Sequence, residues 1–226
     1  MKTVFLICGK MQSGKNQFSD YLKEILEDNN LSVSTDMFAN DLKAQCAVDF
    51  SNLGLVLSKK ADEIYSLVNV FFSHHLNDHS VYLDEINRVI DSLRIHRNNW
   101  YESKTAITRT LLQTYGEDIF RNRVDLEYWA NKLKTRVLAS SSDCVLITDT
   151  RHPNEIDVFD DMTHEDLRIV VIKVERDGIA QSNHQSETSM EDYKAYDYIV
   201  ENNSSLKDLQ DSAKEIAKDL DLLFRK

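Results

Sequence analysis

GKMQSGKN, at residues 9–16, is the segment from which the architecture follows, because it comes after the apolar run VFLIC at residues 4–8 and before a helical pattern. The order is therefore strand, glycine loop, helix. A loop closed by Gly9 and Gly14 can turn its backbone N–H groups inward around a chain of phosphates. Lys15 would reach the β and γ oxygens, and the positive end of the following helix would add to the attraction. The segment predicts a loop that binds a nucleoside triphosphate.

The residues after this loop support the same interpretation. Apolar side chains recur there at the spacing of one helix face: Phe18, Tyr21, Leu22, Ile25 and Leu26. The alternative, an ordinary glycine-rich turn between a strand and a helix, leaves the lysine without an explanation. One position departs from the usual pattern, because Asn16 stands where a serine or threonine hydroxyl normally ligates Mg²⁺. An amide has a carbonyl oxygen but no hydroxyl, so we expect the ion to be held there largely through water.

The composition is that of an ordinary soluble globular protein. Of the 226 residues, 42% are hydrophobic and 29% are charged, which suits one domain, residues 1–226, with a single core. The net charge of −11 argues against a basic face for nucleic acid. No apolar run reaches the roughly 18 residues that span a bilayer, and no cleavable signal is recognisable, so we expect a cytoplasmic location, in the host cell if the chain is viral. The expected partners are small-molecule substrates, without nucleic acid or membrane, and a homodimer stays open.

Strands alternate with helices along the chain, which predicts an α/β fold with a parallel sheet covered on both faces, in three layers. The expected strands are residues 3–8, 31–38, 144–149, 167–174 and 198–201. The expected helices are residues 15–28, 106–115, a longer one through 120–137 after a break at Gly116, and a last one through 206–223. From about 39 to 104 the pattern is polar and helical, and we interpret this segment as a helical insertion.

An acidic residue ends the apolar strand at 144–149, where a phosphate-loop enzyme needs one. At the carboxyl edge of a neighbouring strand, Asp149 can face Mg²⁺ directly or through water. Arg151 follows two residues later, and its guanidinium fork suits phosphate oxygens. Glu155 could orient that arginine or accept a hydrogen bond from a sugar or base. The alternative is a surface Asp–Arg pair that caps the next helix.

A second group of polar residues precedes and follows Gly116. Arg109 and Gln113 are four apart, so they share a helix face that ends at this glycine. Further arginines follow, and together they predict a second anion site, although each arginine taken alone is more often a solvated helix charge. Trp129 could stack on a base or pack as a core residue. A kinase that moves phosphate between two nucleotides needs two such anion sites.

Four motifs, in this order, resemble the deoxynucleoside monophosphate kinases of tailed bacteriophages. The motifs are GKMQSGKN at 9–16, TRTLLQTYGEDIF at 108–120 with Tyr128 and Trp129 downstream, LITDTRHPNEID at 146–157, and Arg176 with HQSE at 184–187. The resemblance covers about the first 26 residues and most of the chain from 105 to the end. Residues 40–104 carry none.

The resemblance implies that the γ-phosphoryl group of ATP is transferred, with Mg²⁺, to a deoxynucleoside 5′-monophosphate. It also implies a P-loop nucleoside monophosphate kinase-like fold, with the insertion near 39–104 binding the monophosphate and a lid near 176–194. The residues expected to hold ATP are Gly9, Lys10, Ser13, Gly14, Lys15, Asn16 and Arg176. The residues expected to hold the acceptor are Arg109, Gln113, Gly116, Trp129, Arg151 and Glu155. The expected catalytic residues are Lys15, Asp149 and Arg151, and the expected metal positions are Asn16 and Asp149.

Some positions depart from the family pattern, and two other functions fit parts of the sequence. Thr110 and Glu117 stand where basic and threonine residues are expected in some relatives, and Asn16 replaces an aspartate, so the roles of these three residues stay open. A kinase of another small phosphorylated metabolite would share the glycine loop and the Asp-Thr-Arg segment. A nucleotide-dependent switch protein would show a guanine-reading NKxD sequence, and the nearest string, NKLK at 131–134, lacks the acid.

Overall fold

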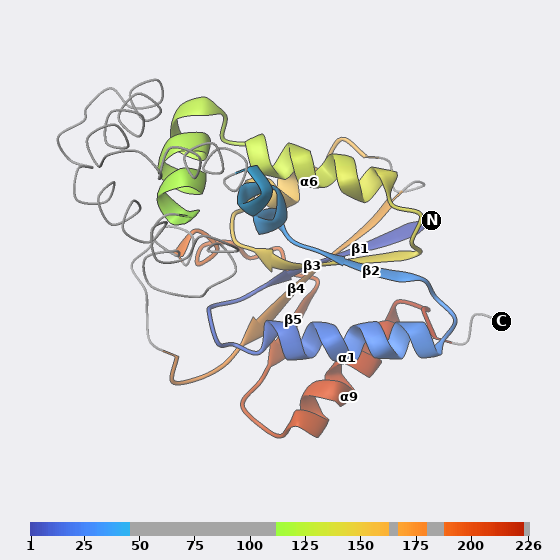
Figure 1. The fold of residues 1–226 in the computed structure, drawn as a ribbon. Coiled ribbons are helices and arrows are strands. Elements are labelled where there is room, and N and C mark those ends of the chain that lie inside the picture. The colour runs from blue at the N-terminus through green and yellow to red at the C-terminus, as the bar shows by residue number, and fades with distance from the viewer. Residues whose placement is uncertain (46–111, 163–166, 180–187, 224–226) are drawn as a thin grey trace, which may run out of the picture. The chain divides into compact units, whose positions relative to one another are not determined.

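A computed structural model describes residues 1–45, 112–162, 167–179 and 188–223 (Figure 1). The chain divides into two compact units, one made of Met1–Phe38 with Ala130–Lys226 and the other of Ala39–Trp129. Most of the predicted helical insertion, together with Arg109, lies outside the described residues. Within the described ranges, no helix combines the length and the apolar character that crossing a membrane requires.

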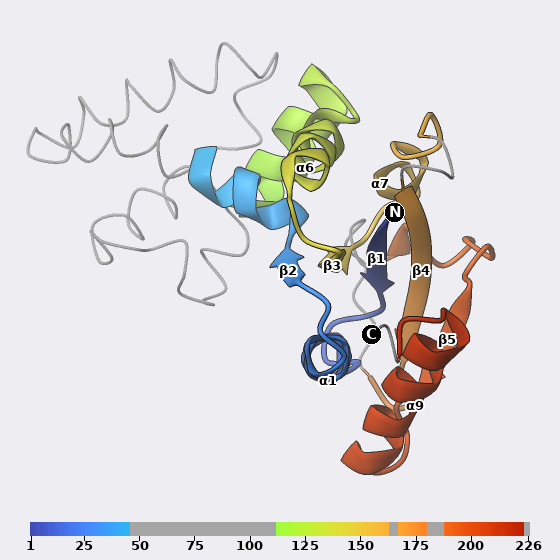
Figure 2. The ribbon, with the colours of Figure 1, turned by 90° about the vertical axis from the view of Figure 1, so that its right-hand side faces the viewer.

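The larger unit contains a five-stranded parallel sheet in the order β2-β3-β1-β4-β5, which Figure 2 shows from one edge strand to the other. The strands are β1 (Lys2–Cys8), β2 (Val33–Asp36), β3 (Cys144–Thr150), β4 (Leu167–Glu175) and β5 (Tyr198–Glu201). The predicted α/β fold with a parallel sheet is confirmed. Strand β2 is shorter than the predicted 31–38, because the N–H of Leu31 still bonds Leu26 at the end of the preceding helix and the chain after Asp36 leaves the sheet.

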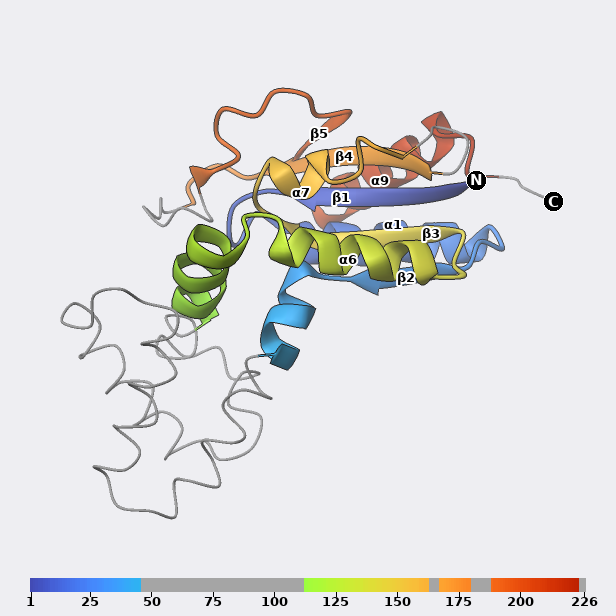
Figure 3. The same ribbon diagram turned by 90° about the horizontal axis from the view of Figure 1, so that it is seen from above.

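Helices cover both faces of this sheet. They are α1 (Lys15–Asp28) and α9 (Leu206–Asp219) on one face, and α6 (Tyr128–Ala139) with the short α7 (Asn154–Asp157) on the other. Figure 1 shows α1 and α9 on the side of the strands opposite α6, and Figure 3 looks down on α6 and α7. Central strand β1 supplies alternate residues to the two cores, with Phe5 packed under α1 and Leu6 under α6. The unit therefore has the three layers expected from the sequence.

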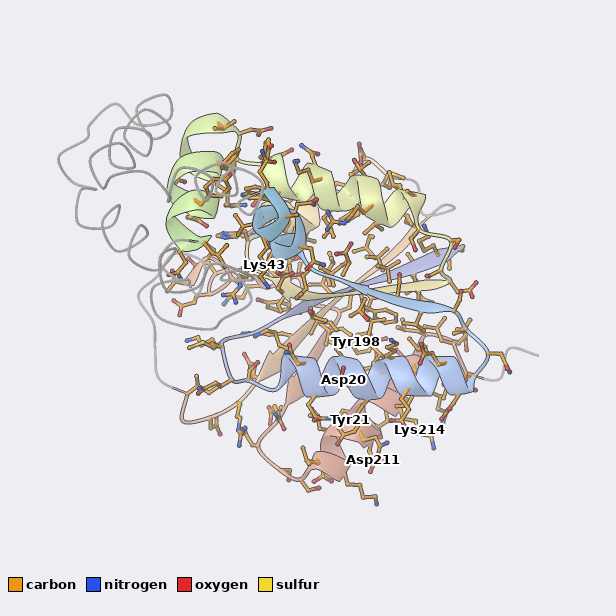
Figure 4. All side chains as sticks on the ribbon, in the orientation of Figure 1. Asp20, Tyr21, Lys43, Tyr198, Asp211 and Lys214 are labelled. Carbon is orange, nitrogen blue, oxygen red and sulfur yellow. The ribbon has the colours of Figure 1, made fainter. Side chains whose placement is uncertain are left out.

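The helix after the glycine loop follows its predicted bounds. Phe18, Leu22 and Leu26 form the buried stripe of α1, because side chains three to four positions apart share a helix face. The helix ends where Asn29 donates a side-chain hydrogen bond to the carbonyl of Ile25, at 2.8 Å. Neighbouring α9 begins with a capping box between Ser205 and Asp208. Polar side chains on the outer faces of these two helices are exposed, among them Asp20, Asp211 and Lys214 in Figure 4.

The predicted helix break at Gly116 is wrong. The chain passes through this residue in a π-helix, η3 (Thr114–Val124), and breaks instead at Asp125, whose backbone is extended. The N–H of Asp125 still bonds Phe120, five residues back, which is the hydrogen-bond spacing of a π-helix. The side chain of Asp125 then accepts the N–H of Glu127 and starts the turn into α6. Glycine is a poor helix former, but here the contacts of Gly116 with Trp129 and Leu42 hold the chain in the helix.

Candidate functional site

The glycine loop lies at the carboxyl end of the central strand, with functional segments on both sides. In the sheet register, Cys8 at the end of β1 pairs with Thr150 of β3 and with Lys173 of β4. The loop that begins at Gly9 is therefore flanked by the chain that leaves β3 and the chain that leaves β4. Connections from β1 and β3 run toward opposite edges of the sheet, so this is the switch point where α/β proteins bind their ligands.

The backbone of the loop requires its two glycines. Gly9 has φ +141° and Gly14 has φ +99°, both in the range that favours residues without a Cβ. A Cβ on Gly9 would lie 2.3 Å from the carbonyl oxygen of Val174, and a Cβ on Gly14 would lie 2.2 Å from the side-chain amide of Asn202. The two glycines thus let β4 and the chain after β5 approach the loop closely. Such a backbone cradle is what a phosphate group needs.

Two side chains of the loop fit a phosphate ligand. Lys15 opens α1, and its ammonium group donates hydrogen bonds to the carbonyl oxygens of Gly9, at 2.5 Å, and Lys10, at 2.7 Å, so it lies over the loop. Ser13 is 1% exposed, and its hydroxyl has no hydrogen-bond partner among the residues that the structure describes. A buried hydroxyl of this kind costs free energy unless a ligand pairs with it. No acidic residue occupies the first turn of α1, so that helix end favours an anion.

Asp149 lies on β3 beside this loop, in an irregular part of the strand. Leu6 pairs with Ile147 and Cys8 with Thr150, so β3 carries one extra residue over this interval. Such a bulge changes the direction of side chains and is frequent near active sites. The Asp149 carboxylate accepts the backbone N–H of Phe38 at 2.8 Å. The chain that follows β2 therefore helps to fix this acid.

A partly buried ion pair steadies the chain that approaches Asp149. Arg136 of α6 donates two hydrogen bonds to Asp36, from Nε at 2.8 Å and from Nη2 at 3.0 Å, and a third to the carbonyl of Met37 at 3.2 Å. This fork geometry is the strongest form of an arginine–carboxylate contact. It holds the end of β2, directly before Phe38. No pattern in the sequence marks Asp36 and Arg136 as partners, because they are 100 residues apart and meet only through the fold.

The turn after β3 is built around Glu155. Its side chain is 5% exposed, and one carboxylate oxygen accepts the backbone N–H of Arg151 at 2.7 Å and that of His152 at 3.1 Å. Glu155 thus fixes the peptide units from which the Arg151 side chain departs. The ring of His152 is also buried and shares a hydrogen bond of 3.0 Å with Ser189.

Cys8, next to the loop, is a packing residue. Burial is the largest cause that raises the pKa of its thiol, to about 12; nearby Glu155 raises it further, and Lys15 and Lys173 oppose the shift. At neutral pH the group is therefore a neutral thiol, and only thiolates are good nucleophiles. The folded protein loses the stability associated with this shift only above the ordinary thiol pKa of 9.0, as pH rises toward 12, because the unfolded chain then ionises first.

The predicted metal positions are a carboxylate and an exposed amide. Asp149 is partly buried at the end of β3, and Asn16 is exposed in the first turn of α1. Among the residues that the structure describes, no group of three or more His, Cys, Asp or Glu side chains could hold a metal by itself. Mg²⁺ at a nucleotide site takes most of its ligands from phosphates and water, with one or two carboxylates. One acid next to a phosphate cradle fits that chemistry.

The predicted lid lies partly outside the described residues, but its two ends are described. Arg176 directly follows β4 and is exposed. At the other end, Glu191 forms an ion pair with Lys10 of the glycine loop at 3.3 Å. His184 and Glu187, which the sequence singled out, lie outside the described residues. The segment before β5 therefore contacts the glycine loop through Glu191 and the turn after β3 through Ser189. The sequence predicted neither contact.

The smaller unit contains an aromatic cluster around Trp129. The indole is 4% exposed and its N–H donates to the carbonyl of Gly116 at 3.0 Å. The ring centroid of Trp129 lies 4.7 Å from that of Tyr128, 5.0 Å from that of Phe120 and 6.4 Å from that of Tyr115. Of the two roles that the sequence left open for Trp129, this is the packing of a core residue.

Close packing also explains why a glycine stands at position 116 in this unit. A Cβ at Gly116 would lie 3.0 Å from the methyl groups of Leu42, so the glycine serves close packing within the unit. Glu117 and Arg121, four residues apart on η3, are both buried, and Nε lies 3.5 Å from Oε1. Arg121 is therefore paired with an acid, and its charge is compensated within the unit. Gln113 lies half-buried at the start of η3.

Comparison with known proteins adds a family match. A family model described as deoxynucleotide monophosphate kinase matches residues 55–213, more than half of the chain. A search among curated proteins gives no match. The matched range includes β3, the turn of Arg151 and the aromatic cluster, whereas the glycine loop precedes it. The loop is therefore assigned from its own sequence and geometry.

Proposed function

The chain belongs to the deoxynucleotide monophosphate kinase family, and we propose that the loop at 9–16 and the turn after β3 carry its phosphoryl transfer from ATP. The single observation that supports this assignment most is the register of β1 with β3, which sets Cys8 beside Thr150. It brings a phosphate cradle and an Asp-Thr-Arg turn to adjacent strand ends, where a transferred phosphoryl group would meet both. The family is that of an ATP-dependent phosphotransferase acting on deoxynucleoside monophosphates.

In this proposal the loop holds the phosphates of ATP. The ammonium group of Lys15 would exchange its contacts with the carbonyls of Gly9 and Lys10 for the β and γ oxygens. The buried hydroxyl of Ser13, which has no hydrogen-bond partner within the described part of the chain, would gain one in a phosphate oxygen. Phosphoryl transfer needs little covalent chemistry from the protein, so alignment of the two nucleotides and neutralisation of the negative charge on the γ oxygens supply most of the rate.

Asp149 and Asn16 are the residues that would hold Mg²⁺, the carboxylate directly or through water and the amide through water. The ion, when bound, neutralises charge that develops on the β and γ oxygens. The contact between Asp149 and the N–H of Phe38 keeps the carboxylate at the strand end. Arg176, exposed after β4, is the further cation that we propose for the ATP phosphates, and the segment 176–194 is the proposed lid that excludes water.

On the acceptor side, we propose that Arg151 binds the phosphate of the monophosphate and the transferred group. Glu155 would act by holding the Arg151 backbone through the hydrogen bond of 2.7 Å. The acceptor roles of Arg109, Gln113 and Gly116 come from the sequence alone and stay predictions. Trp129 would act indirectly, because its buried indole supports the chain at Gly116.

Arg151→Lys tests the acceptor assignment, since it keeps the charge and removes the fork. We expect kcat/KM for the deoxynucleoside monophosphate to fall by roughly 10²-fold, because a lysine cannot bridge two phosphate oxygens. ATP binding, measured by titration calorimetry, should change by less than about threefold. Arg168→Lys is the matched control, because Arg168 lies near the opposite end of the strands, where it donates a hydrogen bond to the backbone carbonyl of Leu220 at 2.9 Å. Equal, small effects of the two substitutions would contradict the role of Arg151.

A further inference from the structure

Two consecutive asparagines follow β5 and hold the two loops that flank the ATP phosphates in the proposed function. The backbone N–H of Asn202 donates to the carbonyl of Glu175, at the end of β4, at 2.7 Å. The side-chain amide of Asn202 donates to the carbonyl of Ser13, in the glycine loop, at 2.9 Å. The side chain of Asn203 accepts the N–H of Asp177, next to Arg176, at 2.8 Å.

The contact with Ser13 fixes the direction of one peptide unit of the loop. Because a trans peptide is planar, the carbonyl of Ser13 and the N–H of Gly14 point in opposite directions. Asn202 holds that carbonyl, so the N–H of Gly14 must point away from Asn202. Backbone N–H groups of such loops are the groups that contact phosphate. Asn202 thereby sets the orientation of a donor that it does not touch.

The close approach of Asn202 also accounts for Gly14. The amide nitrogen of Asn202 lies 2.2 Å from where a Cβ on Gly14 would be, so only glycine allows this contact. The loop and the asparagine, 189 residues apart, are therefore fitted to each other. The second asparagine acts on the neighbouring turn, which carries Arg176 and contains Gly178 with φ +72°.

We propose that Asn202 is a positioning residue for ATP: it orients the Ser13–Gly14 peptide toward the phosphates, while Asn203 holds the Arg176 turn beside them. The proposal rests on the assignment of the glycine loop as the ATP site. Asn202 lies outside that loop, near the other end of the chain, and contacts no reacting atom. Its effect would nevertheless be selective for the nucleotide donor, ATP. If Asn202 had only a structural role, its hydrogen bonds would stabilise the fold, and their loss would weaken the binding of ATP and of the acceptor equally.

The test compares Asn202→Ala with Asn29→Ala. Asn29 is a matched control, since its side-chain amide also donates to a backbone carbonyl, that of Ile25 at 2.8 Å, but at the other end of α1. Loss of one oriented hydrogen bond corresponds to about a fivefold effect. We expect Asn202→Ala to raise the KM for ATP, and the Kd of ATP from calorimetry, by about fivefold or more. The KM for the deoxynucleoside monophosphate should change by less than twofold, and Asn29→Ala should change neither.

Urea denaturation of both variants shows whether a change in ATP binding comes from a less stable fold or from lost positioning. If Asn202→Ala folds poorly, Asn202→Leu, which keeps the branched shape and lacks the donor, takes its place with the same expectation. An ATP Kd that stays within twofold of wild type in a folded variant overturns the proposal, as do equal changes for donor and acceptor. Lys15→Ala runs in parallel: if it leaves ATP binding intact, the ATP-site assignment itself fails, whereas an Asn202 result alone overturns only the positioning role.

Discussion

Replacing Lys15 with alanine is expected to lower kcat by at least about 10²-fold and to weaken ATP binding. The ammonium group is the cation that opens α1, and it lies over the carbonyls of Gly9 and Lys10 in the loop. In the proposed mechanism it neutralises charge on the β and γ oxygens, and removal of one preorganised charge-stabilising group typically costs 10² to 10³ in rate. Alanine keeps the helix, because it is the best helix former.

The measurement is ADP release in a coupled assay with ATP and a deoxynucleoside monophosphate. Lys23→Ala is the control, because Lys23 lies on the same helix in a surface ion pair with Glu27, 3.8 Å long, of the kind that contributes little. We expect this control to keep wild-type turnover. Retention of more than half of the wild-type kcat in Lys15→Ala would place the ATP phosphates away from the loop.

The second large effect is expected on stability, from Gly9→Ala. A methyl group there would lie 2.3 Å from the backbone carbonyl of Val174, a buried residue of β4 that pairs with Val200 of β5. Backbone cannot move aside as a flexible side chain does, and φ +141° adds strain for any residue with a Cβ. We expect the free energy of unfolding to fall by roughly 3 kcal/mol. ATP binding should fall with it, because the loop must shift.

Gly178→Ala separates the cost of a steric clash from the cost of backbone strain at a positive φ. Gly178 also has a positive φ, +72°, but a Cβ there would meet nothing within 4 Å. It should therefore cost about 1 kcal/mol, from backbone strain alone. Urea denaturation of the two variants gives both values. If Gly9→Ala costs no more than Gly178→Ala, the close approach of β4 to the loop is not a feature of the folded protein.

The sheet could be predicted from sequence because its signals are local. The strands β1, β3 and β4 are short runs of mostly apolar residues, and the predicted 3–8, 167–174 and 198–201 fall within one residue of the observed bounds. The loop with its glycines and Lys15 also carries its signal within eight residues. The alternation of strands and helices then implies parallel pairing, since a crossover connection returns the chain in the same direction.

The features that could not be predicted depend on residues far apart in the chain. The carbonyl of Ser13 pairs with Asn202, and Asp36 pairs with Arg136, because the fold brings their elements together. The extra residue in β3 near Asp149 is defined only by its pairing with β1.

The wrong prediction of a helix break at Gly116 has the same origin. The low helix propensity of glycine indicated a break, whereas the hydrogen bond from Trp129 holds the chain in a helix.

Turnover with individual monophosphates shows whether the chain phosphorylates deoxynucleotides. The purified chain is incubated with ATP and Mg²⁺, and ADP release is followed with each deoxynucleoside and ribonucleoside monophosphate in turn and with ATP alone. We expect at least one deoxynucleoside monophosphate to accelerate ADP release well above the ATP-only background, with an equal amount of the deoxynucleoside diphosphate formed. If no monophosphate raises ADP release above that background, the chain does not transfer phosphate to deoxynucleotides, and the proposed roles of its loop and turn are wrong.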